Sequence, residues 1–160
     1  MPIQVGDRIP EVSLKLAAPG GIRDVSTKEL FAGRKVVLFA VPGAFTPTCS
    51  AKHLPGFVEQ AAALRAKGVD AVVCLSVNDA FVMGAWARDQ RVGDAVQMVA
   101  DGSADFTRAV GLELDGTKFG MGVRSQRYAL VAEDGVVTKL FVDAPMKFEV
   151  SSAEHVLRSL

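Results

Sequence analysis

The chain has 160 residues, the size of one domain with a substantial core. Hydrophobic residues make up 49% and charged residues 22%, and eighteen basic residues balance eighteen acidic ones. This balance argues against nucleic acid or an anionic membrane surface as a partner. The apolar runs are far shorter than the about 20 residues that a membrane span needs, so we expect no membrane association.

The opening stretch, MPIQVGDRIP, lacks the charged and apolar regions of a secretory signal, and it is not rich in Arg and Ser. We therefore expect a cytoplasmic location. Two cysteines, Cys49 and Cys74, cannot build a disulfide scaffold, and in a reducing compartment both are expected to be free thiols. Histidines and cysteines are too scattered to suggest a metal site, and we predict neither a metal nor a cofactor.

The first half of the chain predicts strands around one helix. A hairpin is expected over residues 11–16 and 21–25, and two continuous aliphatic runs follow at Lys35–Val41 and 69–77. Such runs are typical of strands covered on both faces. A helical segment lies between the two runs, so this order implies a right-handed crossover and a parallel pair. Within that segment Pro55 should kink or break the helix, and Gly68 is a good C-cap.

The second half continues the alternation. We predict a helix over 78–91, capped by Asn78 or Asp79, and then a strand over 95–100. A short helix from Ser103 to Val110 follows, and residues 125–132 and 135–142 form a hairpin that turns at Asp134 and Gly135. The chain ends in a helix whose capping box is Ser151 and Glu154. The sum is a single α/β domain over residues 1–160. We expect a thioredoxin-like fold, in which a central mixed sheet has helices on both faces.

The stretch VPGAFTPTCS places a thiol just beyond the end of a predicted strand. Reactive groups of open α/β sheets collect at this end of the strands. If Thr46 is the N-cap, Pro47 takes the first helical position and Cys49 falls in the first turn. Free backbone N–H groups and the helix dipole there favour the thiolate of Cys49. The alternative is a loop that merely contains a small hydrophobic residue.

Pro42, Thr46 and Cys49 match the P-x-x-x-T-x-x-C motif of peroxiredoxins. The longer stretch VPGAFTPTCSAKHLPGF resembles the peroxiredoxin 5 and plant type II subfamily, and so do CLSVNDAFVMGAWA and GVRSQRYAL. The resemblance implies a thioredoxin-like thiol peroxidase that reduces hydrogen peroxide and alkyl hydroperoxides through a Cys49 sulfenic acid. It also implies a role in antioxidant defence and cell redox homeostasis. The alternative is a redox-signalling protein that passes Cys49 oxidation to a partner.

The resemblance also implies roles for neighbouring residues. Arg124 is expected over the sulfur, where it would stabilise the thiolate and hold the peroxide oxygens. Thr46 would hydrogen-bond the substrate, and the ring of Pro42 would shield the sulfur from water. Backbone N–H groups of Gly43 or Ala44 would complete the donors of the substrate pocket. Without the resemblance, Arg124 would be interpreted as a solvated charge at a strand end.

Cys74 lies in AVVCLSV, among aliphatic neighbours. We expect it to be a buried structural residue with a raised pKa rather than a resolving partner of Cys49. Animal members of the subfamily carry a further cysteine late in the chain, but FVDAPMKFEVSSAEH has none. The resemblance therefore predicts that an external thiol recycles Cys49: glutathione with glutaredoxin, or thioredoxin.

His53 follows Cys49 by four residues, which would place both on one face of a continuous helix. A Cys–His pair can serve a hydrolase, but no acyl-binding motif accompanies it. We expect His53 to be exposed or to take part in packing, with tuning of the thiol as the other possibility.

Aromatic and sulfur-containing residues gather near the motif and early in the next predicted helix. Core packing and an exposed patch for a partner are both open for this group. Because the family commonly dimerises around the active site, Phe45, Phe81 and Trp86 are the candidate homodimer interface. Phe45 and Phe119 are also candidate pocket residues, with Phe119 on an apolar wall that would admit organic peroxides.

Overall fold

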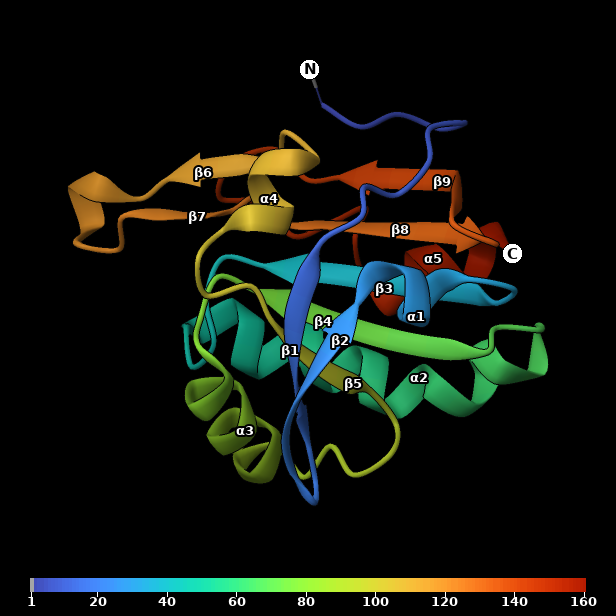
Figure 1. The fold of residues 1–160 in the computed structure, drawn as a ribbon, viewed down its shortest axis with the longest axis horizontal. Coiled ribbons are helices and arrows are strands. Elements are labelled where there is room, and N and C mark those ends of the chain that lie inside the picture. Colours follow the sequence, from blue (N-terminus) through green and yellow to red (C-terminus); the bar gives the residue numbers. More distant parts are fainter. Residues whose placement is uncertain (1) are drawn as a thin grey trace.

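The structure, a computed structural model, describes residues 2–160. Its centre is a seven-stranded sheet in the order β2-β1-β5-β4-β3-β8-β9 (Figure 1). The strands are β1 Ser13–Ala18, β2 Gly21–Ser26, β3 Lys35–Val41, β4 Ala71–Ser76, β5 Gln97–Ala100, β8 Tyr128–Glu133 and β9 Val136–Val142. A second sheet pairs β6 Glu113–Asp115 with β7 Val123–Ser125, and it projects from the body at the left of Figure 1.

The helices lie on both faces of the large sheet. They are α1 Thr27–Phe31, α2 Leu54–Ala66, α3 Ala80–Asp89, α4 Asp105–Ala109 and α5 Ala153–Ser159. A π-helical turn, Cys49–His53, leads directly into α2, and a 3₁₀ turn covers Thr117–Phe119. The structure thus has the mixed α/β architecture expected from the sequence.

The centre of the sheet is parallel and its flanks are antiparallel. β3 pairs with β4 in parallel, with Phe39 opposite Cys74, and β4 pairs with β5 in parallel. β8 runs antiparallel to β3, with Tyr128 opposite Ala40, while β1 runs antiparallel to β5. The predicted parallel pairing of the two strands around the helix is confirmed.

Successive residues of β3 point to opposite faces, as strand geometry requires. Val37, Phe39 and Val41 pack into one core cluster with α2, α3 and α5. The alternate residues of β3 join a second cluster with α1 and α4. β3 is covered on both faces, which explains its continuous apolar sequence.

The caps of two helices lie one residue after the predicted ones, and in both places a buried carboxylate takes up backbone N–H groups near the helix start. The N-cap of α4 is Ala104 rather than Ser103, and Asp101 accepts the N–H groups of Phe106 and Thr107. The N-cap of α5 is Ser152 rather than Ser151, whose side chain donates to Asp143 instead. The capping box with Glu154 is therefore not formed at Ser151.

The hairpins were predicted in the right places, and so were the ends of two helices. Asp134 and Gly135 both have positive φ, as a tight turn between β8 and β9 demands. Asp79 caps α3 by accepting from Val82 N–H. Gly68 has φ of +92° just after the C-cap of α2, a conformation suited to glycine.

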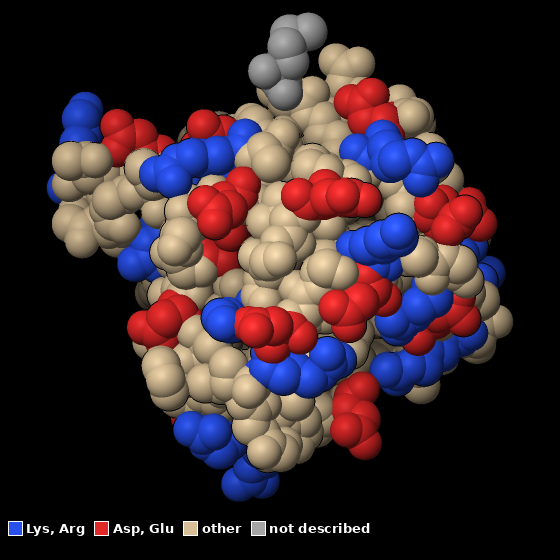
Figure 2. Space-filling model, in the orientation of Figure 1, with Lys and Arg blue, Asp and Glu red and all other residues tan. Residues whose placement is uncertain are grey.

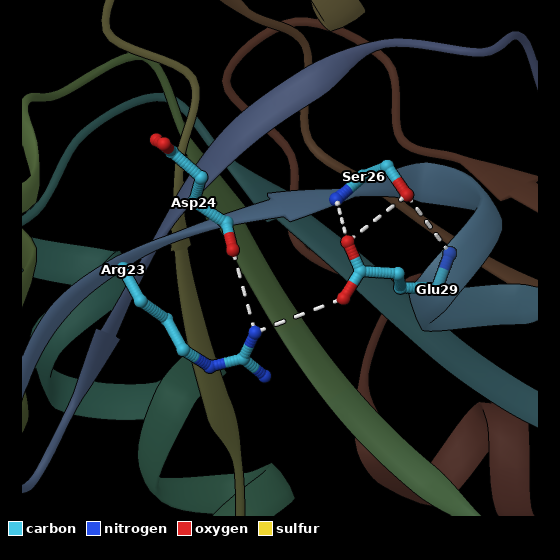
Figure 3. A network of polar contacts seen from close by, with 4 residues as sticks. All are labelled: Arg23, Asp24, Ser26 and Glu29. Carbon is cyan, nitrogen blue, oxygen red and sulfur yellow. Dashed lines mark hydrogen bonds and ion pairs between the residues drawn. The ribbon is translucent and has the colours of Figure 1, made fainter.

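The short helix α1 was not predicted, although Ser26 followed three residues later by Glu29 is the pattern of a helix N-terminus. Ser26 Oγ accepts from Glu29 N–H, and the Glu29 carboxylate accepts from Ser26 N–H (Figure 3). Arg23 reaches both the Glu29 carboxylate and the Asp24 carbonyl oxygen (Figure 3). This exchange of hydrogen bonds is a capping box.

Acidic and basic side chains are interspersed over the face shown in Figure 2, as the balanced composition suggests. Within residues 2–160, no helix has the length and apolar character required to cross a membrane.

Candidate active site

The turn after β3 leads into a helix that begins where the sequence predicts. Thr46 Oγ1 donates to the Gly43 carbonyl oxygen at 2.6 Å, and Ser50 N–H donates to the Thr46 carbonyl oxygen at 3.0 Å. Residues 47 and 48 are helical, so Thr46 precedes the helix and Pro47 opens it. Cys49 therefore lies in the first turn, where N–H groups point outward without an intrahelical acceptor.

Of the two effects expected at Pro55, a kink or a break, the helix shows no break. It is widened over Cys49–His53 into a π-helical turn, which closes with Leu54 N–H donating to the Cys49 carbonyl oxygen. Pro55 then occupies the first turn of α2, where its missing N–H is tolerated. Single π-helical turns of this kind are frequent at functional sites.

The Cys49 sulfur is buried and receives a hydrogen bond from an arginine. Arg127 Nη2 donates to Cys49 Sγ at 3.2 Å. Arg127 immediately precedes β8, whose Tyr128 pairs with Ala40 near the end of β3. The antiparallel pairing of β8 with β3 thus brings the guanidinium to the strand end from which Cys49 follows.

The expectation that Arg124 lies over the sulfur is corrected. Arg124 belongs to β7, in the small projecting sheet, and its Nε donates to the Met121 carbonyl oxygen at 2.9 Å. Its Nη1 donates to the Pro42 carbonyl oxygen at 3.4 Å, so Arg124 supports the turn rather than the thiol. Within GVRSQRYAL, the sequence clue to the right arginine was the strand start at Tyr128.

Gly43 leaves room for the Arg124 guanidinium beside the turn. A Cβ at position 43 would lie 2.9 Å from Arg124 Nη1 and 3.0 Å from Thr46 Cγ2. Ala44, in contrast, has no N–H free for substrate, because that group donates to Asn78 Oδ1 at 2.9 Å. The expected contribution of Ala44 N–H to the donor set is therefore corrected.

His53 is fully buried and makes two hydrogen bonds. Its Nε2 is 2.9 Å from the Ser151 carbonyl oxygen, and its Nδ1 is 2.8 Å from Arg127 Nη1. Both partners fix the tautomer: Nε2–H donates to the carbonyl, and the Nδ1 lone pair accepts from the guanidinium. Burial of the ring, together with the nearby charge of Arg127, lowers the pKa of His53 to about 3.

Aromatic rings enclose the imidazole. The ring of His53 lies 5.0 Å from Phe39, 5.7 Å from Phe57 and 4.9 Å from Phe148, measured between centroids. The Arg127 guanidinium carbon lies 5.7 Å from the centroid of Phe148. The expectation of a packing histidine is confirmed, and the polar contacts add a feature that the sequence did not reveal.

Asp143 organises the segment that carries the Ser151 carbonyl. Its carboxylate accepts the N–H groups of Glu149, Val150 and Ser151, together with the Ser151 hydroxyl. Burial alone would raise the pKa of Asp143, but these hydrogen bonds outweigh it and lower the pKa. Asp143 N–H also donates to the Arg127 carbonyl oxygen at 3.0 Å.

Cys74 is fully buried in β4, as expected from its aliphatic neighbours. Burial raises the pKa of the Cys74 thiol well above its ordinary value, and the nearby Cys49 adds to this shift. Both cysteines are free thiols.

The aromatic group near the motif divides between surface and core. Phe45 and Phe81 are exposed at 51% and 77%, whereas Trp86 is fully buried, so Trp86 is removed from the candidate interface. Met83 is fully buried as well. Trp86 Nε1 donates to Ser50 Oγ at 3.0 Å, and the Trp86 ring lies 6.5 Å from that of Phe45.

Phe119 lies on the surface of the 3₁₀ turn with 73% of its area exposed. Met121 comes closer to the turn after β3, since its Cε would lie 3.5 Å from a Cβ at position 43. Among residues 2–160 there is no group of three or more histidine, cysteine or acidic residues arranged to hold a metal ion.

Comparison with known proteins finds relatives over nearly the whole chain. The family model described as Redoxin matches residues 4–157. The chain is 55% identical over 163 residues to peroxiredoxin-2E-2, chloroplastic, of Oryza sativa subsp. japonica, covering 99% of the chain and 72% of that relative. It is 48% identical over 160 residues to peroxiredoxin-2B of Arabidopsis thaliana, covering 99% of both. The structure of reduced Prx3 from Vibrio vulnificus in complex with hydrogen peroxide superposes with a TM-score of 0.93, at 53% identity and 98% coverage of both chains.

Proposed function

Because this chain belongs to the redoxin family and is a peroxiredoxin, and hence a thiol peroxidase, we propose that Cys49 is the thiol that peroxide oxidises. The observation that carries the assignment is the hydrogen bond from Arg127 Nη2 to Cys49 Sγ. Cys74, in contrast, has a strongly raised pKa because it is buried. The thiolate is the nucleophilic form of cysteine, so a guanidinium at the sulfur favours Cys49.

The proposed step is an in-line displacement at oxygen. The Cys49 thiolate attacks one peroxide oxygen, the O–O bond breaks, and the sulfur becomes a sulfenic acid. The departing oxygen carries the electron pair away and takes up a proton, which gives water from hydrogen peroxide or an alcohol from an alkyl hydroperoxide. Arg127 donates to the sulfur and, through its fork of N–H groups, to the charge that develops on oxygen.

Thr46 and Pro42 complete the proposed site. The Thr46 hydroxyl donates to the Gly43 carbonyl oxygen, which leaves its oxygen lone pairs free to accept a hydrogen bond from the peroxide. The Pro42 carbonyl oxygen is bound by Arg124, which fixes the turn whose proline ring is proposed to shield the sulfur. Substrates are proposed to be hydrogen peroxide and alkyl hydroperoxides.

Recycling is proposed to use an external thiol. That thiol attacks the sulfenic sulfur and releases water, and a second thiol then frees Cys49 and leaves as a disulfide. Cys74 is a poor internal partner because it is fully buried in a central strand and its pKa is raised. Glutathione with glutaredoxin, or thioredoxin, are the proposed reductants, and their reducing compartment suits the cytoplasmic location that we propose.

Steady-state peroxide reduction tests both assignments. Native protein, Cys49→Ser and Cys74→Ser are each assayed with glutathione plus glutaredoxin, and separately with thioredoxin and its reductase. We expect Cys49→Ser to lose turnover and Cys74→Ser to retain it. Mass spectrometry after one equivalent of peroxide identifies the oxidised product. A Cys49–Cys74 disulfide as the main product would contradict recycling by an external thiol.

Self-association is proposed to use the exposed aromatic rings beside the site. Phe45 lies in the turn before Cys49 and Phe81 in the first turn of α3, and both are exposed. These two residues, without Trp86, are the proposed homodimer interface. A signalling relay is not favoured, since the relatives are named for peroxide reduction.

A further inference from the structure

Arg127 is held by an uncharged acceptor. The ion pairs of residues 2–160 join Lys15 to Asp24 and Arg23 to Glu29, so within this range no carboxylate pairs with Arg127. Its Nη1 donates to His53 Nδ1 and its Nη2 donates to Cys49 Sγ. Because the guanidinium is planar and rigid, fixing one amino group fixes the direction of the other.

The acceptor at His53 depends on a second contact behind it. A neutral imidazole has one donor and one acceptor nitrogen, and Nε2 must be the donor because it faces the Ser151 carbonyl oxygen. Nδ1 then presents its lone pair to Arg127. Asp143 in turn holds Ser151 through its backbone and hydroxyl, so the carbonyl is fixed by a buried carboxylate.

We propose that His53 is a positioning residue that aims the Arg127 guanidinium at the Cys49 sulfur, and that it does so while leaving the positive charge of Arg127 unneutralised. The inference rests on the proposed role of Cys49. The imidazole stays neutral throughout the working range of pH, since burial lowers its pKa to about 3. A carboxylate acceptor would partly neutralise the positive charge of Arg127 and so weaken its interaction with the thiolate. A neutral imidazole orients the guanidinium without neutralising its charge.

Two amide substitutions separate the contacts of His53. In His53→Asn the side-chain oxygen stands near the position of Nδ1 and can accept from Arg127. In His53→Gln the amide reaches the position of Nε2 and can serve Ser151, but not Arg127. His155→Asn is the matched control, because His155 lies on α5 and packs edge-on against Phe141, whereas Arg127 makes its side-chain hydrogen bonds to His53 and Cys49.

The first readout is the rate of Cys49 alkylation by iodoacetamide as a function of pH, measured in Cys74→Ser protein. We expect His53→Gln to raise the half-maximal pH by about one unit, which means about tenfold less thiolate at lower pH. His53→Asn and His155→Asn should stay close to the native profile. An unchanged profile in His53→Gln, or equal shifts in the Asn and Gln variants, would overturn the proposal.

A double variant tests whether His53 acts through Arg127. In an Arg127→Gln background, His53→Gln should have little further effect on alkylation or on peroxide reduction, because their effects are coupled. Additive losses would show an independent structural role instead. Both rates are compared only between variants that circular dichroism shows to be folded to the same extent.

The native protein supplies a measurement that no folding defect can obscure. Long-range ¹H–¹⁵N correlation spectra of the His53 ring should show a protonated Nε2 and an unprotonated Nδ1 at neutral pH. The opposite tautomer would overturn the proposal. Alkylation and tautomer need no peroxide, so an inactive native protein would contradict the peroxidase assignment of Cys49 while leaving these outcomes readable.

Discussion

Two arginines three residues apart differ in what they contact. Arg127 donates to the Cys49 sulfur and Arg124 donates to the backbone of the turn at Pro42. Both are half-buried, and each is anchored by a second acceptor, so burial does not distinguish them. The distinction is geometric, and it makes the pair a matched test of the proposed chemistry.

Arg127→Gln should lower the second-order rate constant for peroxide reduction by about 100-fold, because loss of one aimed donor in a catalytic site has about that cost. Arg124→Gln should lower it by less than about tenfold, through a looser turn. Peroxide consumption under single-turnover conditions measures both. A larger loss in Arg124→Gln than in Arg127→Gln would reverse the assignment.

His53 also affects stability in acid. The folded protein keeps the imidazole neutral to a pKa of about 3, whereas in the unfolded chain it takes up a proton near pH 6.5. The unfolded state therefore binds more protons below about pH 6.5, and the free energy of unfolding falls as pH decreases from there towards about 3. The slope is about 1.4 kcal/mol per pH unit well inside this window.

Urea denaturation at pH 7 and pH 5 measures this loss. The native protein and His155→Asn should lose about 2 kcal/mol on acidification through His53, while His53→Asn, which lacks the imidazole, should lose much less. Equal losses in all three proteins would contradict a buried neutral His53.

At the scale of elements, carboxylates decide where loops end and helices begin. Asp101 accepts two N–H groups in the first turn of α4, and Asp143 accepts the N–H groups of the segment before α5; the caps of both helices lie one residue after the predicted serines. A carboxylate five to eight residues from the N–H groups it accepts falls outside the spacing of the usual capping rules. These rules therefore located the two helices but predicted Ser103 and Ser151 as their caps.

Asp143→Asn should destabilise the protein by about 3 kcal/mol, because hydrogen bonds to a charged acceptor contribute about 1.5 to 3 kcal/mol each and the amide can keep only part of them. Asp115→Asn is the control: Asp115 also accepts from a neighbouring N–H and hydroxyl, but at the exposed end of β6. Thermal unfolding followed by circular dichroism compares them. A melting temperature of Asp143→Asn equal to that of the control would contradict the role of Asp143.

At the scale of the molecule, the sheet explains which parts of the site were predictable. Thr46, Pro47 and Cys49 follow one another on a single turn, so local rules for helix starts located them. Arg127 reaches the sulfur only through the pairing of β8 with β3. His53 meets Arg127 and Ser151 only through that pairing and the packing of residues 143–151 against the π-helical turn. The start of β8 at Tyr128 is the one local sign of Arg127, while its contact with the sulfur depends on strand register over a long sequence separation, so the resemblance alone did not separate it from Arg124.

The proposed dimer is also a property of the whole molecule. Phe45→Asp and Phe81→Asp each place a charge on an exposed ring position of the interface, and we expect either change to shift the protein towards monomer, because burying an unpaired charge is costly. Val5→Asp, at another exposed apolar position, is the control. Sedimentation velocity over a concentration series measures the shift; no change in either phenylalanine variant would place the interface elsewhere.

The sole tryptophan of the chain gives the protein an intrinsic optical probe. The indole of Trp86 is shielded from solvent and hydrogen-bonded to the hydroxyl of Ser50, the residue that follows Cys49. Any rearrangement of that first helical turn on oxidation changes the polarity around the fluorophore. Its emission can therefore follow successive cycles of oxidation and reduction in real time, without a dye attached to either thiol.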